Sequence, residues 1–201
     1  MRSDSALGVP FWSEEEIAAA VRPALEQIEM RRVLAYPTET VYGFGGGIDR
    51  DSVDALIRLK GRPPGKPFLL LIAGSDMLGK LDLSLPSFAT NLAARFWPGP
   101  LTLVLPGGEQ RVPEALRGPE GGVAVRWTSH RGLERLILTY GDAITSTSAN
   151  RPGVPPATSA REIREQWATR SRAGVCAYWT AGRSSHRRHR RWWIARDARR
   201  A

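Results

Sequence analysis

Short apolar runs alternate with segments of helical periodicity between about residues 13 and 169, and this alternation restricts the chain to a layered α/β fold. Ser13-Glu-Glu-Glu16 is a capping-box sequence, and apolar residues recur after it at helical spacing, so we expect a helix over 13–29. Strands are predicted for the apolar runs 32–36, 68–73, 101–105, 123–126 and 143–145.

Further helices are predicted between these strands. One follows Gly45-Gly-Gly47 and ends at Gly61, and another opens at Pro86 with Phe88, Leu92 and Phe96 along one face. A short helix is expected around Leu133 and Ile137, and Ser159 with Glu162 caps the last one.

The composition excludes several classes of protein. The longest apolar run has six residues, which is too short to span a membrane, and the N-terminus carries no apolar signal segment. One cysteine, Cys176, excludes internal disulfides, and with three histidines the chain is not expected to hold a metal through protein ligands alone. We therefore expect a soluble, cytoplasmic protein without a membrane partner.

The net charge of +9 lies entirely in the last part of the chain. Residues 170–201 contain ten arginines and one acid, whereas 1–169 contain 19 basic and 19 acidic residues. We predict a domain over 1–169 and an atypical Arg-rich tail over 170–201. The tail is interpreted as disordered, or as a high-GC gene read in a shifted frame.

Lys60, Arg62 and Lys66 are three cations close together on a segment that prolines stiffen, which is typical of a loop that binds a nucleoside triphosphate. The spacing does not match a Walker A loop. A solvated basic loop is the alternative interpretation.

Hydroxyl-rich turns follow two of the predicted strands. Pro37-Thr-Glu-Thr40 and Thr145-Ser-Thr-Ser-Ala-Asn150 are placed where open α/β sheets bind ligands, although each sequence is also typical of a turn that bonds its own backbone. Arg126 ends a strand of apolar residues, so it meets either a buried acid or a ligand carboxylate. We expect His130 to cap or pack rather than to catalyse.

These motifs together resemble the YrdC-like family of L-threonylcarbamoyl-AMP synthases over about residues 12–169. The matching segments are Tyr36-Pro-Thr-Glu-Thr-Val-Tyr-Gly, Lys60-Gly-Arg62 with Lys66-Pro67, Trp97-Pro-Gly-Pro-Leu-Thr102, Val123-Ala-Val-Arg126 and Ser148-Ala-Asn150. The resemblance implies a twisted mixed sheet with flanking helices around a concave cleft.

It also implies that L-threonine, bicarbonate and ATP, with Mg²⁺ on the phosphates, give threonylcarbamoyl-AMP and pyrophosphate. The product would pass to the machinery that makes threonylcarbamoyladenosine in tRNA. By the same resemblance, Thr38, Arg126 and Ser146 bind threonine. ATP is bound by Lys60, Arg62, Lys66, Ser148 and Asn150, of which Lys60 and Arg62 are the expected catalytic residues.

After residue 170 the chain departs from the family, because the expected Ser-Thr-Val-Val-Asp-like strand and the basic residue that follows it are missing. Arginines with Trp192 and Trp193 are typical instead of a surface that binds RNA phosphates and bases. A non-enzymatic RNA-binding protein, double-stranded RNA included, is therefore the alternative function.

Overall fold

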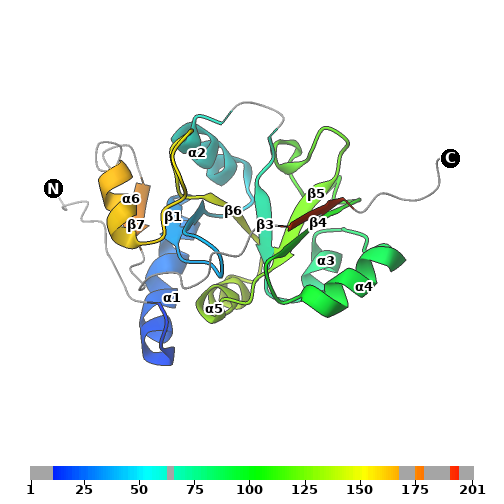
Figure 1. Ribbon diagram of the computed structural model, residues 1–201, viewed down its shortest axis with the longest axis horizontal. Coiled ribbons are helices and arrows are strands. Elements are labelled where there is room, and N and C mark those ends of the chain that lie inside the picture. Colours follow the sequence, from blue (N-terminus) through cyan, green and yellow to red (C-terminus); the bar gives the residue numbers. More distant parts are fainter. Residues whose placement is uncertain (1–10, 63–65, 168–174, 179–190, 195–201) are drawn as a thin grey trace.

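An eight-stranded mixed sheet organises the computed structural model, with the strand order β7-β1-β2-β6-β3-β5-β4-β8 (Figure 1). The structure describes residues 11–62, 66–167, 175–178 and 191–194. The strands are β1 (Val33–Tyr36), β2 (Gly43–Gly45), β3 (Leu69–Ile72), β4 (Leu101–Leu105), β5 (Val123–Trp127), β6 (Ile144–Ser148), β7 (Val175–Tyr178) and β8 (Arg191–Ile194).

The pairing is antiparallel through β1, β2, β6 and β3, parallel between β3 and β5, and antiparallel between β5 and β4. At the two ends of the sheet, β7 pairs parallel with β1 and β8 pairs parallel with β4. The mixed α/β architecture expected from the sequence is therefore confirmed.

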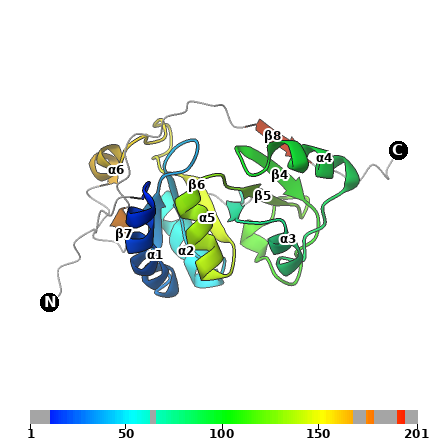
Figure 2. The same ribbon diagram turned by 90° about the horizontal axis from the view of Figure 1, so that it is seen from below.

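Helices pack on this sheet, and every described α-helix except the one over 76–80 lies where the sequence predicts a helix. They are α1 (Glu14–Glu29), α2 (Arg50–Lys60), α3 (Asp76–Lys80), α4 (Ser87–Phe96), α5 (Arg131–Tyr140) and α6 (Ala160–Trp167), with a short 3₁₀ helix at Glu114–Leu116. α1 packs against α5 and β1, α5 against β3 and α4 against β4. Figure 2 shows α1, α2 and α5 on one side of the sheet.

Side-chain caps explain where several helices begin and end. The Ser13 hydroxyl accepts from the Glu16 N–H, and the Glu16 carboxylate accepts from the Ser13 N–H, so the predicted capping box is present. Gly61 ends α2 in the left-handed conformation at φ 56°, as its position in the sequence predicted. Ser159 accepts from the Glu162 N–H at the start of α6.

The side of α4 that carries Phe88, Leu92 and Phe96 is not the side that is buried. Phe88 and Phe96 are 42% and 43% exposed, whereas Ala89 and Ala93 are buried. Small side chains on the inner face let α4 lie close to β4, which leaves the larger apolar residues on the outer face.

β2 is not among the strands predicted from the sequence, since glycines are poor strand formers. The structure pairs it on both sides, with β1 and β6. A Cβ atom at Gly45 would overlap the carbonyl oxygen of Thr145 and the hydroxyl of Tyr36, so only glycine fits this close approach. Glycine thus makes β2 hard to predict from the sequence, and it is also the residue that lets β2 lie against β6.

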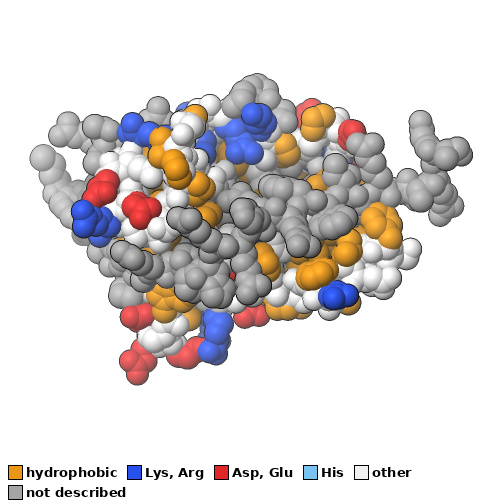
Figure 3. Space-filling model, viewed as in Figure 1, with side chains coloured by type: hydrophobic (Ala, Val, Ile, Leu, Met, Phe, Trp, Pro, Cys, Tyr) orange, Lys and Arg blue, Asp and Glu red, His pale blue; other side chains and the backbone are white. Residues whose placement is uncertain are grey.

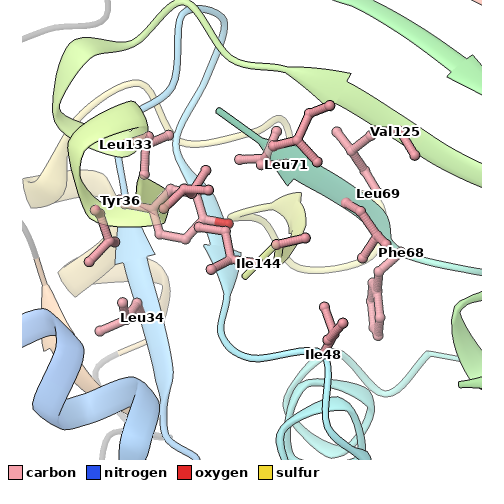
Figure 4. Packing of buried hydrophobic residues seen from close by; sticks show 14 of the residues in the cluster. Leu34, Tyr36, Ile48, Phe68, Leu69, Leu71, Val125, Leu133 and Ile144 are labelled. Carbon is pink, nitrogen blue, oxygen red and sulfur yellow. The ribbon is translucent and has the colours of Figure 1, made fainter. Parts of the chain in front are cut away.

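The apolar side chains of the central strands form one core with the inner faces of the helices. Figure 4 shows side chains from β1, β3, β5, β6 and α5 gathered in it, among them Tyr36, Leu71 and Ile144. The Tyr36 hydroxyl donates to the Thr145 carbonyl at 2.8 Å, and burial raises the pKa of this tyrosine. Within the described residues, no helix is both long and apolar enough to cross a bilayer.

The division of the chain at residue 169 stays a prediction. Residues 175–178 and 191–194 form β7 and β8, and the rest of the Arg-rich tail predicted over 170–201 lies outside the described residues. The shifted-frame interpretation of the tail also stays a prediction.

Candidate functional site

The turn between β1 and β2 is held by the hydroxyl of Thr38. Its Oγ1 accepts from the N–H groups of Thr40 and Val41, at 3.1 and 3.2 Å, and donates to the Val41 carbonyl at 2.6 Å. Thr38 is 5% exposed. The self-bonded turn that the sequence left open is therefore present, and it presents threonine side chains at the end of β1.

Arg126 at the end of β5 is almost completely buried and has two partners. Its Nε and Nη2 donate to Thr102 Oγ1 at 3.1 and 2.9 Å, and its Nη1 donates to Glu39 Oε1 at 3.2 Å. The carboxylate of Glu39 also accepts from Thr128 Oγ1 at 2.9 Å. Of the two partners expected for this arginine, the structure contains the buried acid.

The same arginine lines a pocket between the β1–β2 turn, β3 and β6. The three residues predicted to bind threonine, which are Thr38, Arg126 and Ser146, all lie in its wall. The remainder of the wall combines hydroxyl groups with apolar side chains: Thr40, Val41, Tyr42, Gly43, Leu69, Leu71 and Thr147. Such a mixture suits a small ligand that has a charged end and a short carbon skeleton.

Lys60, at the end of α2, is directed onto the turn that follows β6. Its ammonium donates to the carbonyl oxygens of Ser148, at 2.9 Å, and Asn150, with Asn150 Oδ1 at 3.4 Å. It also lies 5.8 Å from the ring centroid of Trp167. The Asn150 amide donates to the Val154 carbonyl at 2.7 Å, so this turn is braced from two sides.

Arg62 braces the basic loop and connects it with the pocket. Nε and Nη2 donate to the carbonyls of Lys66 and Pro67, at 2.6 and 2.9 Å, while Nη1 donates to Thr147 Oγ1 at 3.3 Å. The guanidinium also lies 4.7 Å from the Phe68 ring centroid, and burial lowers its pKa. Figure 3 shows Lys and Arg side chains gathered over the segment between α2 and β3.

The structure thus brings the predicted residues together along the end of β6. Ser146 and Thr147 line the pocket, whereas Ser148 and Asn150 contact Lys60. Arg62 lies between the two groups through Thr147. Lys66 is exposed, and only its carbonyl has a contact described here, with Arg62. Residues 63–65 of this loop lie outside the described residues.

Glu39, Thr102 and Thr147 lie in the predicted motifs, but none of the three was given a role of its own. The signal for Glu39 was present, since a buried arginine in an apolar strand requires an acid and Glu39 lies beside Thr38 in the same motif. The roles of Thr102 and Thr147 could not be singled out within their motifs, because threonine is common in strands whether or not a ligand is bound.

His130 caps a helix, as predicted. Its Nδ1 accepts from the Leu133 N–H at 3.3 Å at the start of α5, and Phe11 stacks on its ring. Burial lowers its pKa to about 4. In the part of the chain that the structure describes, no group of three or more His, Cys, Asp or Glu side chains is placed to hold a metal ion.

A family model labelled Sua5/YciO/YrdC and described as "Telomere recombination" matches residues 26–178, which is more than half of the chain. The chain belongs to the Sua5/YciO/YrdC family. This membership accounts for the order of the motifs along the sequence and for the sheet that brings them together.

Named relatives in the Sua5/YciO/YrdC family support this assignment. The chain is 40% identical over 148 residues to the threonylcarbamoyl-AMP synthase of Pyrococcus abyssi, covering 73% of this chain and 43% of that protein. It is 38% identical over 151 residues to the synthase of Halorhodospira halophila, covering 75% and 78%. The chain therefore spans less than half of the Pyrococcus protein but most of the Halorhodospira one.

A solved structure of the family extends the similarity to three dimensions. Pyrococcus abyssi Sua5 in complex with L-threonine superimposes with a TM-score of 0.72 at 36% identity, covering 85% of this chain and 48% of that one. The Sua5/YciO/YrdC fold of this chain is thus shown by sequence and by structure.

Proposed function

We propose that this protein is an L-threonylcarbamoyl-AMP synthase. The observation that carries the proposal is that one pocket is lined by Thr38, Arg126 and Ser146 and is connected with Arg62 through Thr147. Relatives named for this activity, and a family member solved with L-threonine, support the same substrate.

The threonine end of the reaction uses the pocket. The guanidinium of Arg126 binds the substrate carboxylate, and the hydroxyls of Thr38 and Ser146 bind its polar groups. The uncharged amine of threonine combines with bicarbonate, and a carbamate forms with loss of water. A carbamate oxygen then attacks the α-phosphorus of ATP, the bond to the β-phosphate oxygen breaks, and pyrophosphate leaves.

The nucleotide end uses the cations and the β6 turn. Arg62 and Lys66 neutralise the charge that develops on the leaving pyrophosphate, and Ser148 and Asn150 hold the nucleotide phosphates. Mg²⁺ enters with ATP as part of the substrate. Because Lys60 already donates to the carbonyls of that turn, we propose that it supports catalysis by holding the turn in place.

We further propose that the protein works in the cytoplasm and hands its product to a transferase that modifies tRNA. No enzyme nucleophile is needed for the reaction, since the carbamate itself attacks.

The test is to incubate the purified protein with MgATP, bicarbonate and L-threonine and to measure pyrophosphate and threonylcarbamoyl-AMP by mass spectrometry. We expect both products, and neither when threonine is omitted or replaced by D-threonine. Salt-dependent RNA binding without turnover would favour the RNA-binding alternative and overturn the proposal.

A further inference from the structure

Glu39 is placed behind Arg126 rather than in the pocket. Arg126 and the neighbours of Glu39 in the chain, Thr38 and Thr40, line the pocket wall, whereas Glu39 does not. Its side chain is 12% exposed, and it forms an ion pair with Arg126, which is 2% exposed. The carboxylate therefore reaches the ligand site only through the arginine.

Both oxygens of Glu39 are used, and this fixes the orientation of the carboxylate. Oε1 accepts from Arg126 at 3.2 Å, and Oε2 accepts from Thr128 Oγ1 at 2.9 Å. Thr128 Oγ1 in turn accepts from the His130 N–H at 3.1 Å, so the carboxylate is anchored to the start of α5. A rigid acceptor of this kind fixes the plane of the guanidinium that it binds.

The hydrogen bonds of Arg126 leave part of its donor set unused. A guanidinium has five N–H donors, of which Nε–H and one Nη2–H are directed to Thr102 and one Nη1–H to Glu39. One N–H on each of Nη1 and Nη2 has no partner among the described residues. Two N–H donors on the neighbouring Nη atoms of one guanidinium are what a carboxylate can accept in a bidentate arrangement.

We infer that Glu39 is a positioning residue that aims the two remaining N–H groups of Arg126 at the carboxylate of the amino-acid substrate. The inference rests on the proposed function for the identity of that substrate. Because Glu39 also balances the buried charge of Arg126, the pocket selects a carboxylate through directed hydrogen bonds more than through net charge.

The experiment compares KM values for L-threonine, L-threoninamide and ATP in the wild type and in Glu39→Gln. Threoninamide lacks the carboxylate, so it reports what Arg126 contributes. We expect Glu39→Gln to raise the KM for threonine about tenfold, to leave the KM for ATP within about twofold, and to lose most of the preference for threonine over threoninamide.

The matched control is Glu165→Gln, which removes a carboxylate from an exposed Arg161 pair on α6 and should leave all three KM values unchanged. In an Arg126→Gln background, Glu39→Gln should add nothing, because the two residues act in series. An unchanged threonine KM in Glu39→Gln, or an equal rise for ATP, would overturn the inference.

If Glu39→Gln does not fold, Thr128→Ser and Thr128→Val decide the question, since serine keeps the hydroxyl that supports the carboxylate and accepts from the His130 N–H, whereas valine removes it. The threonine KM of Thr128→Ser should match the wild type. We expect Thr128→Val to raise the threonine KM by less than Glu39→Gln does. An unchanged threonine KM in Thr128→Val would overturn the inference. Failure of the wild type itself to release pyrophosphate with threonine would contradict the proposed function instead.

Discussion

Arg62 donates through Nη1 to Thr147 Oγ1 at 3.3 Å, and this contact connects the basic loop with the wall of the pocket that Thr38, Arg126 and Ser146 line. The proposed threonine site and the proposed ATP site are thus connected through the side chain of Arg62. A carbamate formed in the pocket meets the phosphates of ATP next to a cation that has already been oriented by two carbonyls.

Arg62→Ala should lower kcat by about two to three orders of magnitude, as loss of a transition-state donor does in other enzymes. The kcat is measured as the rate of pyrophosphate release at saturating concentrations of all substrates. Arg58→Ala is the control, because Arg58 is exposed in the last turn of α2, close to Arg62 in the sequence, and the activity of this variant should match the wild type. Near-normal turnover by Arg62→Ala would contradict the assigned role.

Lys60→Met should reduce the free energy of unfolding by about 1–3 kcal/mol, because the carbonyls of Ser148 and Asn150 lose a charged donor. Urea denaturation followed by circular dichroism measures the change. Lys80→Met, at an exposed position in α3, serves as the control and should alter stability by no more than about 0.5 kcal/mol. Equal effects of the two substitutions would show that the turn does not depend on Lys60.

Stability should fall as the pH is lowered from 6.5 to about 4. An unfolded histidine takes up a proton at its ordinary pKa of 6.5, whereas burial lowers the pKa of His130 to about 4. The unfolded state therefore binds more protons between these values, and the contribution, on the order of 3 kcal/mol, is complete above pH 6.5 and lost below it.

Urea melts of the wild type and of His130→Asn across this range test the pH effect. Asparagine still caps α5 but does not titrate. The difference between the two proteins should therefore shrink as the pH falls, while acid effects of carboxylates are common to both. A difference that stays constant with pH would rule out His130 as the source.

Gly45→Ala should cost more than about 3 kcal/mol, because the new methyl group overlaps the Thr145 carbonyl in the neighbouring strand. Gly79→Ala in α3 meets no atom within 4 Å, and alanine is the better helix former, so it should be neutral or stabilising by up to about 1 kcal/mol. Thermal melts compare the pair. A mild effect at Gly45 would mean that β2 and β6 separate easily.

The sequence predicted the helices well because their limits are set by local chemistry. The Ser13 capping box and the left-handed Gly61 are each visible within a few residues. The face of α4 could not be predicted in this way, because Ala89 faces the sheet only through a tertiary contact. β2 was missed for the same reason, since its glycines make sense only beside the Thr145 carbonyl.

In the candidate site, too, some features could be predicted from the sequence and others could not. Motif order was enough to select Thr38, Arg126 and Ser146, which the structure brings to one pocket. The orientation of Lys60 toward backbone carbonyls was not predictable, because a lysine side chain has many rotamers and the carbonyls lie 88 and 90 positions away in the sequence.

The placement of β6 in the middle of the sheet has a consequence for how this protein can change. Along that strand, the Thr145 carbonyl accepts from the Tyr36 hydroxyl, and Ser146 and Thr147 line the pocket. The strand then ends at Ser148, whose carbonyl accepts from Lys60. Deleting or inserting one residue there would reverse the side of every following side chain and dismantle both binding regions together. Selectivity can therefore be tuned by exchanging side chains along β6, whereas its length is not free to vary.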